Sequence, residues 1–306
     1  MNTRLGTTLE TLRKVVFESN KRILFVTGAG LSLDSGIPLF RSELDGGDGS
    51  AVWNSKLEAW ATIKSFRENP TKWYLTFCNQ FSYWNSFIYA KPNESHKILS
   101  NLCIQFPDRI KVITQNIDGL MRLSGCPEES IIEVHGRIDY LRCSNKSCEY
   151  SCRKCIKANL ESIVDDKKIK KNFYRDWVCP ECKQQLLPLF LLFDETYNSH
   201  SYYQWEKAQT WMSEAEIMIF IGTSFSVLCT DCCLFYAYRN KIPIYNVNIR
   251  PSEICFELNT GEYGDCHVIE YPSNLTHNIV KTSTDFLSIL SKGKNSEGDD
   301  QSKKQL

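Results

Sequence analysis

Four apolar runs constrain the fold more than any other feature of this sequence. They are RILFVTG (22–28), IKVITQN (110–116), EIMIFIG (216–222) and IPIYNVN (242–248). Each run is rich in β-branched residues and lacks polar alternation, which is typical of strands buried on both faces of a parallel sheet. Residues 8–20, 94–106 and 201–215 have helical spacing. The alternation predicts an α/β fold with a Rossmann-like parallel sheet domain.

Two segments interrupt the alternation and predict a smaller inserted domain that is helical and zinc-binding. Residues 49–90 are aromatic and helical in character, and residues 139–186 are rich in lysine and cysteine and lack strong strands. The remaining chain is then assigned to the Rossmann-like domain, as residues 1–48, 91–138 and 187–290.

Composition narrows the class of protein. Lys plus Arg equals Asp plus Glu at 36 each, so net charge gives no reason to expect direct nucleic-acid binding. The N-terminus lacks the apolar stretch of a secretory signal, and no run approaches the roughly 20 residues of a membrane span. We expect an intracellular, cytoplasmic protein with a disordered tail over 291–306. Its oligomeric state stays open.

The cysteines indicate a metal site. The chain has 14, and in a reducing compartment metal binding, catalysis or burial explains such a number better than disulfides do. Cys143-x4-Cys148 and Cys179-x2-Cys182 form two close pairs, the arrangement that tetrahedral Zn²⁺ requires, and four thiolates leave no open position, so the site is structural. A competing pair, Cys152-x2-Cys155, could replace the first.

The first apolar run ends in a glycine-rich turn, Gly28-Ala29-Gly30. Such a turn can direct backbone N–H groups at a pyrophosphate, and the Ser32 hydroxyl adds a donor. Alone the pattern is weak, because a third glycine is missing and Leu33 stands in its place. The pattern continues to Phe40-Arg41, farther along the chain than the usual dinucleotide-binding fingerprint extends.

Polar residues also follow the second run, at the edge where α/β folds place ligands. Gln115 and Asn116 can bond sugar hydroxyls, and Asp118 can accept from a carboxamide. His135 follows another short strand, in EVHGR. A lone histidine is usually structural, but beside a polar strand end it is a candidate general base.

A series of motifs resembles the sirtuins, the NAD-dependent protein deacylases. In order along the chain they are GAG-x-S-x-x-SGIP-x-FR, TQNIDGL, HG, the paired-cysteine insert, GTS (222–224) and VN (247–248). The resemblance covers about residues 20–290. It favours Cys143 and Cys148 over Cys152 and Cys155 as zinc ligands. It also implies that the long loop continues past the phosphates to cover the nicotinamide ribose.

The resemblance implies an acyl-lysine protein as substrate, with NAD consumed to release nicotinamide and O-acyl-ADP-ribose. His135 would deprotonate a ribose hydroxyl, and Asn116 would share the catalytic site. Phe190, Leu191 and Phe193 would line the acyl-lysine tunnel, although ordinary core packing explains them equally well. The residues that would contact NAD are Gly28, Ala29, Gly30, Ser32, Phe40, Arg41, Gln115, Asn116, Ile117, Asp118, Gly222, Thr223, Ser224, Asn248 and Cys266.

The sequence departs from the sirtuin pattern at several positions. Leu39 replaces an Asp before Phe-Arg, Asp194 replaces the Gly of F-G-E, and Cys229 stands near a usual proline. Phe77 and Gln80 stand where desuccinylating members carry Tyr and Arg, so an apolar acyl group such as acetyl or longer is favoured over an acidic one.

Three rival functions remain. The same site could hydrolyse NAD or transfer ADP-ribose to another nucleophile. The chain could also be a zinc-stabilised NAD-sensing or scaffolding module without activity. That function would predict substitution of His135, Asn116 or Asp118, and all three residues are present. A redox dehydrogenase would not need the Phe40-Arg41 extension.

Overall fold

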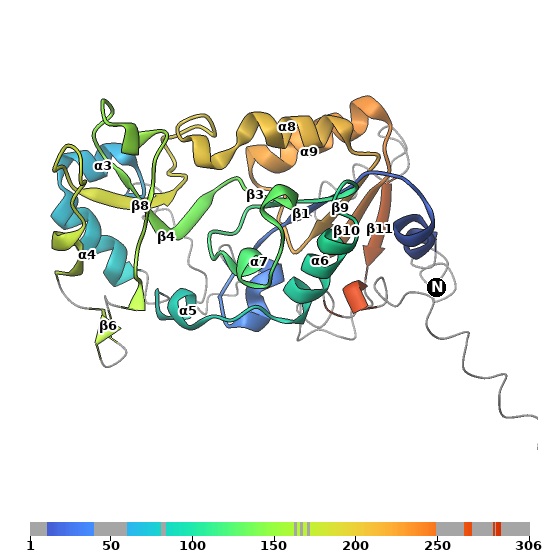
Figure 1. Cartoon of the computed structure of the whole chain (residues 1–306), viewed down its shortest axis with the longest axis horizontal. Helices are drawn as coiled ribbons and strands as arrows, with labels where there is room; N and C mark the ends of the chain where they lie inside the picture. Colours follow the sequence, from blue (N-terminus) through green and yellow to red (C-terminus); the bar gives the residue numbers. More distant parts are fainter. Residues whose placement is uncertain are drawn as a thin grey trace, which may run out of the picture.

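The computed structural model describes most of the chain, in two lobes joined side by side along the long axis of the molecule (Figure 1). The described residues are 11–39, 60–80, 84–161, 164–165, 168–169, 172–248, 266–270, 284 and 286–288. Phe40, Arg41, the whole of the 49–59 stretch and the 291–306 tail lie outside them.

The larger lobe is built on a six-stranded parallel sheet, which confirms the predicted α/β class. Its strands are β1 (Ile23–Thr27), β2 (Ile110–Thr114), β3 (Ile131–Glu133), β9 (Ile217–Ile221), β10 (Ile244–Asn248) and β11 (Cys266–Glu270). Their order is β11-β10-β9-β1-β2-β3, with every pair parallel. The chain reverses its direction of travel across the sheet between β1 and β9, and ligands bind at such a switch point in open α/β sheets.

Helices cover both faces of this sheet, which explains why its strands lack polar alternation. Ile23 and Phe25 of β1 pack into one apolar cluster, and Leu24 and Val26 pack into the other. The helix over residues 11–18 and α6 (Glu94–Gln105) belong to the first cluster. Helices α8 (Trp205–Glu214) and α9 (Leu228–Asn240) belong to the second and lie together at the top of Figure 1.

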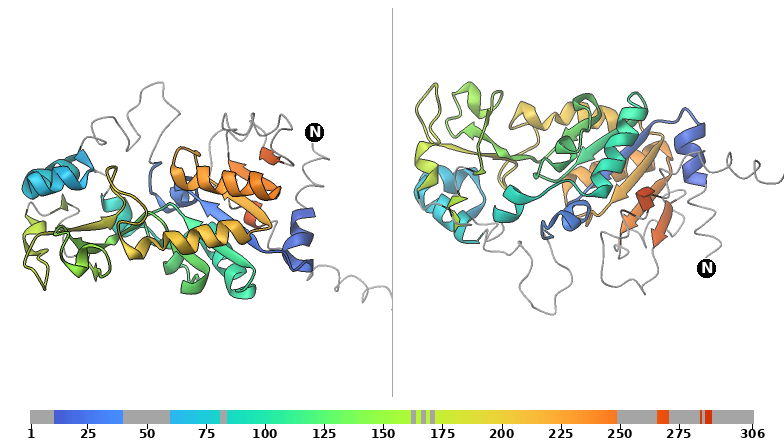
Figure 2. Two further views of the ribbon diagram at one scale, coloured as in Figure 1. Left: turned by 90° about the horizontal axis from the view of Figure 1, so that it is seen from above. Right: turned by 60° about the horizontal axis from the view of Figure 1, so that its bottom comes forward.

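The smaller lobe contains a three-stranded antiparallel sheet and three short helices (Figure 2). Strands β5 (Ile156–Lys157), β4 (Gly136–Cys143) and β8 (Leu186–Phe190) form the sheet in that order, and β6 (Val164–Asp165) pairs with β7 (Lys168–Ile169). The helices are α3 (Ile63–Glu68), α4 (Pro70–Gln80) and α5 (Trp84–Tyr89). These helices all lie within residues 60–89 of the predicted helical segment, whereas the antiparallel sheet was not expected.

Aromatic rings hold the small lobe together. The Tyr74 ring stacks on Tyr174 at 4.7 Å between centroids and meets Phe66 and Trp177 edge to face. Its hydroxyl donates to the backbone oxygen of Leu186 at the start of β8. The helices are therefore fixed to the sheet by a buried ring with a satisfied polar end.

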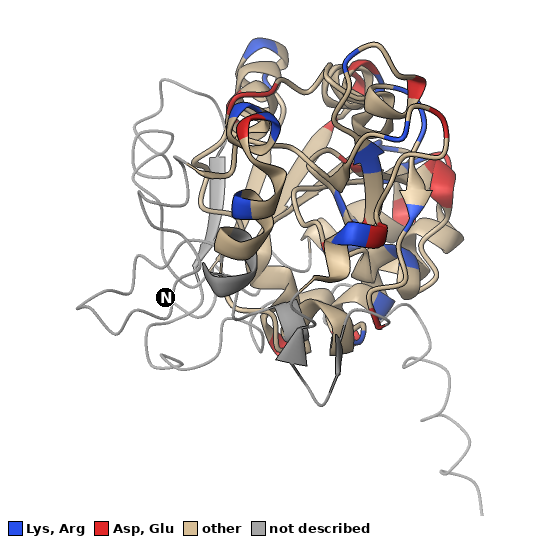
Figure 3. Cartoon of the chain, turned by 90° about the vertical axis from the view of Figure 1, so that its left-hand side faces the viewer, with Lys and Arg blue, Asp and Glu red and all other residues tan. Residues whose placement is uncertain are grey.

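Positions of Lys and Arg and of Asp and Glu are interspersed along the ribbon at the end of the molecule turned to the viewer in Figure 3. Among the described residues no helix combines the length and the apolar character that crossing a bilayer requires.

Three glycines bring two loops into direct backbone contact at the switch point. A β-carbon built on Gly28 would lie 2.7 Å from the Gly222 oxygen, and one on Gly30 would lie 2.7 Å from the Gly222 Cα. Gly222 has a left-handed φ of 61°. The loops after β1 and β9 can approach this closely only because no side chain stands between them.

We expect Gly222→Ala to destabilise the fold by about 2–4 kcal/mol, because a β-carbon there would lie 2.6 Å from the Gly30 Cα and would add left-handed strain. Gly125→Ala is the matched control, since Gly125 also has a positive φ, 92°, but nothing lies within 4 Å of its added carbon. The control should cost about 1 kcal/mol. Urea unfolding of both variants tests this, and equal costs would contradict it.

Candidate active site

The loop after β1 forms a short 3-10 helix, η1 (Ala29–Ser35), at the switch point. It ends at Gly36, whose φ of 80° is left-handed, just before Pro38. The Gly28 N–H donates to the Ile221 oxygen at 3.0 Å, and the Gly30 N–H donates to the Gly222 oxygen at 2.9 Å. Residues 37–39, the last described residues of this loop, are not helical.

Three predicted polar residues from distant segments meet beside this loop. The Ser32 hydroxyl donates to Asp118 Oδ2 at 2.6 Å and accepts from Asn116 Nδ2 at 3.0 Å. Asn116 also donates to the Gly28 oxygen at 3.0 Å. Burial raises the pKa of Asp118, and the Ser32 hydrogen bond opposes that rise. These contacts fix the loop after β1 against the loop after β2.

Two further residues complete this network, and sequence reasoning missed both. His96 Nε2 lies 3.3 Å from the Ser32 hydroxyl, and burial lowers the pKa of His96 to about 4. Asn93 caps α6 by accepting from the His96 N–H at 3.2 Å, and its side chain donates to the Leu31 oxygen at 2.8 Å. An Asn three residues before a His was the available signal, and it is a weak one because histidine is not a usual partner in this cap.

The loop after β9 joins the same edge. Gln115 Nε2 donates to the Thr223 hydroxyl at 3.1 Å, and Asn248 Nδ2 donates to the Thr223 oxygen at 2.9 Å. Ser224 is exposed and bonded to Ser226 at 2.9 Å. Cys266 begins β11, and its side chain lies outside the described residues.

His135 lies where β3 passes into β4, and both of its ring nitrogens are engaged. Nδ1 is 2.8 Å from the Gln115 oxygen, and Nε2 is 3.0 Å from the Tyr197 hydroxyl. Burial lowers the pKa of His135 to about 4, against the opposing effect of the Gln115 carbonyl. The imidazole is therefore neutral at pH 7, the form that a general base needs.

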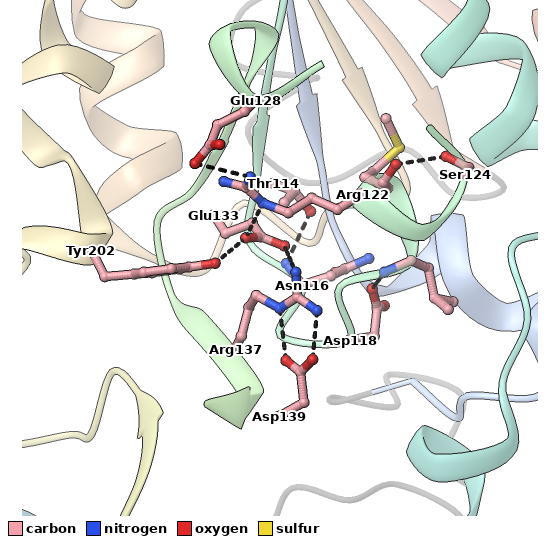
Figure 4. Close-up of polar contacts among 12 residues, drawn as sticks. Thr114, Asn116, Asp118, Arg122, Ser124, Glu128, Glu133, Arg137, Asp139 and Tyr202 are labelled. Atoms are coloured by element: carbon pink, nitrogen blue, oxygen red, sulfur yellow. Dashed lines mark hydrogen bonds and ion pairs between the residues drawn. The ribbon is translucent and has the colours of Figure 1, made fainter. Parts of the chain in front are cut away.

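A buried carboxylate, that of Glu133, lies in β3 two residues before His135 and binds Arg122, four residues after Asp118 (Figure 4). Glu133 is 1% exposed and accepts from Arg122 Nε at 2.7 Å and from the Tyr202 hydroxyl at 2.6 Å. Arg137 lies 3.8 Å from Glu133, and its guanidinium covers the backbone of Gly119. Glu133 thus joins β3 to the segment after Asp118 and to Tyr202, so the network holds these segments in one arrangement.

The residues predicted to line an acyl-lysine tunnel lie at the junction of the two lobes. Phe190 is buried in the small-lobe core, Leu191 packs half-buried against the α8–α9 cluster, and Phe193 is exposed. The Leu191 N–H donates to the His135 oxygen at 2.9 Å, which brings this segment next to the candidate base. Ile117, whose oxygen accepts from Ile138 at 2.9 Å, contacts the same core.

Asp194 has a definite structural role. Its two carboxylate oxygens accept from the backbone N–H groups of Ile63 at 2.7 Å and Lys64 at 3.0 Å, at the start of α3. The next residue, Glu195, pairs with the buried Arg142 of β4. The departure from F-G-E thus ties the end of the β8 segment to the helical part of the small lobe.

Four cysteine sulfurs converge in the small lobe. The Sγ atoms of Cys143, Cys148, Cys179 and Cys182 all lie within 4.8 Å of one another. Two of the separations are 3.3 Å (Cys143–Cys182) and 3.6 Å (Cys148–Cys179), close to the roughly 3.8 Å between thiolates in a tetrahedral zinc site. The donor set fits one structural zinc. Cys152, which is exposed, and Cys155 are not part of the cluster.

Comparison with known sequences gives one consistent result. The model of the Sir2 family matches residues 28–229. A Dictyostelium discoideum protein named NAD-dependent deacetylase sir2E is 37% identical over 238 residues, which cover 76% of this chain and 66% of that protein. An Aquifex aeolicus protein named NAD-dependent protein deacylase is 33% identical over 75% of this chain and 84% of its own.

Solved structures of Sir2 homologues share the fold. A Sir2 homologue in complex with NAD superposes with a TM-score of 0.65 at 20% identity, over 92% of this chain and 94% of that one. A Sir2 structure with a deacetylated peptide and 3′-O-acetyl ADP-ribose has the same TM-score at 21% identity, over 92% of this chain and 97% of its own.

We expect Cys179→Ser to abolish zinc binding and to unfold the small lobe, because this lobe depends on the metal to join β4 to the segment before β8. Cys152→Ser is the control and should retain one zinc per chain. Elemental analysis and near-ultraviolet circular dichroism test this. Loss of zinc from the Cys152 variant with retention in the Cys179 variant would contradict the assignment.

Proposed function

This chain belongs to the Sir2 family, and from that premise we propose that it is an NAD-dependent protein lysine deacylase. It would transfer the acyl group of an acyl-lysine to ADP-ribose and release nicotinamide. The observation that carries the proposal is the meeting of Ser32, Asn116 and Asp118, through hydrogen bonds of 2.6 and 3.0 Å, at the carboxyl edge of the sheet. His135 follows the end of β3 at the same edge of the sheet, and its imidazole ring is neutral at pH 7.

In this proposal NAD lies across the switch point. The backbone of Ala29 and Gly30 and the Ser32 hydroxyl would receive the pyrophosphate, since no side chain at Gly28, Gly30 or Gly222 blocks its approach. Phe40 and Arg41, predicted to cover the nicotinamide ribose, lie outside the described residues. NAD would supply the ribose carbon that loses nicotinamide and bonds to the carbonyl oxygen of the acyl-lysine.

The adenosine and nicotinamide ends would be held by separate residues. Thr223, Ser224 and Asn248 would bind on the adenosine side, where Asn248 and Thr223 are already joined by a 2.9 Å hydrogen bond. Ile117 and Asp118 would bind the nicotinamide carboxamide. We propose that Cys266 lies by the adenine.

His135 would act as the general base. Its Nδ1 faces a carbonyl oxygen, which can only accept, so this nitrogen carries the proton and Nε2 carries the lone pair. A neutral imidazole can take the proton of a ribose hydroxyl on its unprotonated nitrogen. The closed four-cysteine set would hold zinc as a structural ion with no open position for chemistry.

The peptide substrate would pair with the segment after β8, between the two lobes. We propose that Phe190, Leu191 and Phe193 provide an apolar wall for the acyl-lysine, which favours acetyl or longer apolar groups. We also propose an intracellular, cytoplasmic protein with no direct nucleic-acid partner, on the basis of the balanced charge and reduced cysteines.

We expect the protein, given NAD and an acetyl-lysine peptide, to yield deacetylated peptide, nicotinamide and O-acetyl-ADP-ribose. His135→Ala should lower product formation by at least about 100-fold, because it removes the general base. Mass spectrometry of all three products is the measurement, with longer apolar acyl chains and a succinyl peptide in parallel.

Two results would contradict this function. Nicotinamide and free ADP-ribose formed equally with and without peptide would identify an NAD hydrolase, and ADP-ribose attached to a protein would identify a transferase. A faster reaction with the succinyl peptide than with the apolar series would contradict the acyl preference alone.

We expect Asp194→Gly to raise the KM for the acyl peptide about three- to tenfold and to leave the KM for NAD unchanged. The substitution removes the acceptor for two N–H groups at the start of α3, a contact of the helix-cap type worth about 0.5–2 kcal/mol. Asp194→Asn keeps one acceptor oxygen and should have an intermediate KM. An unchanged KM for peptide in Asp194→Gly would show that the contact between Asp194 and the start of α3 does not shape the peptide site.

A further inference from the structure

The Tyr197 side chain occupies a position that the proposed reaction does not account for. Its ring is buried, 6% exposed, between the imidazole of His135 and the indole of Trp205. Ring centroids are 5.7 Å apart on the His135 side and 4.1 Å apart on the Trp205 side, with interplanar angles of 22° and 15°. The ring is therefore held in one orientation with its hydroxyl directed at the candidate base.

The direction of the hydrogen bond between the two side chains follows from their neighbours. His135 Nδ1 lies 2.8 Å from the Gln115 carbonyl oxygen, so Nδ1 carries the hydrogen and Nε2 of the neutral ring is an acceptor. The Tyr197 hydroxyl, 3.0 Å from Nε2, must then donate. Tyr197 thus occupies the lone pair with which a general base would take a proton.

The backbone N–H of Cys229 is near the Tyr197 hydroxyl, and it opposes the rise in the pKa of Tyr197 that burial causes. Cys229 lies in the first turn of α9, where backbone N–H groups have no partner within the helix. A proline, which stands near this position in the family pattern, has no N–H. The departure at Cys229 therefore leaves a backbone N–H on this side of Tyr197.

We propose that Tyr197 is a positioning residue for His135: its hydroxyl, fixed by the stacked ring, holds Nε2 in the NAD-free chain and is replaced there by a ribose hydroxyl when the dinucleotide binds. The proposal rests on the proposed function, because it takes the ribose as the ligand of His135. Only one donor can occupy the Nε2 lone pair, so the two hydroxyls compete for it.

The surroundings add little charge to this pair. The groups that shift the pKa of Tyr197 upward are, after burial, the thiols of Cys229, Cys232 and Cys233 on α9. For His135 the causes are burial, which lowers its pKa, and the Gln115 carbonyl, which raises it. A donor to the neutral imidazole disfavours the imidazolium further. Loss of the hydroxyl should therefore make His135 easier to protonate.

The first measurement needs no activity. Chains labelled with ¹⁵N in histidine are titrated by NMR, and His135→Ala identifies the His135 signal. We expect Tyr197→Phe, which keeps the stacked ring, to raise the pKa of His135 and to shift the Nε2 resonance toward that of a free acceptor. Tyr203→Phe is the matched control, since the buried Tyr203 hydroxyl has no hydrogen-bond partner among the described residues.

The second measurement compares two ligands by calorimetry. ADP-ribose carries the ribose that would meet His135, and ADP lacks it. Tyr197→Phe should bind ADP-ribose about two- to tenfold more tightly, the worth of one hydrogen bond that no longer has to be broken, with ADP unchanged. Damage to the fold would weaken both ligands.

An unchanged His135 titration in Tyr197→Phe would overturn the contact itself. Weaker binding of ADP-ribose, with ADP unchanged, would overturn the exchange, because Tyr197 would then assist the ribose. If the wild-type chain binds neither ligand, the proposed function fails, while the titration still tests the role of Tyr197.

Discussion

The contact between two backbone loops at the switch point is the constraint on which the rest of the site depends. Strands β1 and β9 lie far apart in the sequence and adjacent in the sheet. Because Gly28, Gly30 and Gly222 carry no side chains, the loops that follow these strands touch. This contact places Ser32 within reach of Asn116 and Asp118 from the neighbouring strand. Any β-carbon here would separate the two halves of the candidate dinucleotide site.

A second constraint acts at the junction of the lobes. The chain passes from β3 to β4 through His135 and Gly136, and a β-carbon on Gly136 would lie 2.2 Å from the Leu189 oxygen. Glycine therefore allows the segment after β8 to run directly beside His135. The cysteine cluster fixes the far end of the same β4–β8 pair, and Asp194 joins it to α3. A structural metal distant from the base can thus influence how a peptide would meet it.

The parts of this architecture with a strong local pattern could be predicted from sequence. Buried strands such as 217–221 are recognisable from their runs of β-branched residues. The glycine turn is recognisable from its residue types. Sequence spacing left two cysteine pairs as rivals, because only folding shows that Cys143 and Cys148 approach Cys179. His96 and Tyr197 could not be found, since their partners Ser32 and His135 are 64 and 62 residues away. Phe190 is buried and Phe193 is exposed, although both lie within one apolar run, residues 186–193.

The departures from the family pattern are not independent substitutions. Asp194 is exposed, and its two carboxylate oxygens accept from the N–H groups of Ile63 and Lys64 at the start of α3. Cys229 leaves a backbone N–H near Tyr197, the partner of His135, where a proline would have none. For Leu39 the structure offers no explanation. Where a departure can be explained, it changes the contacts between a loop of the site and the start of a helix. Such contacts change how firmly the reacting groups are held while leaving the groups themselves in place.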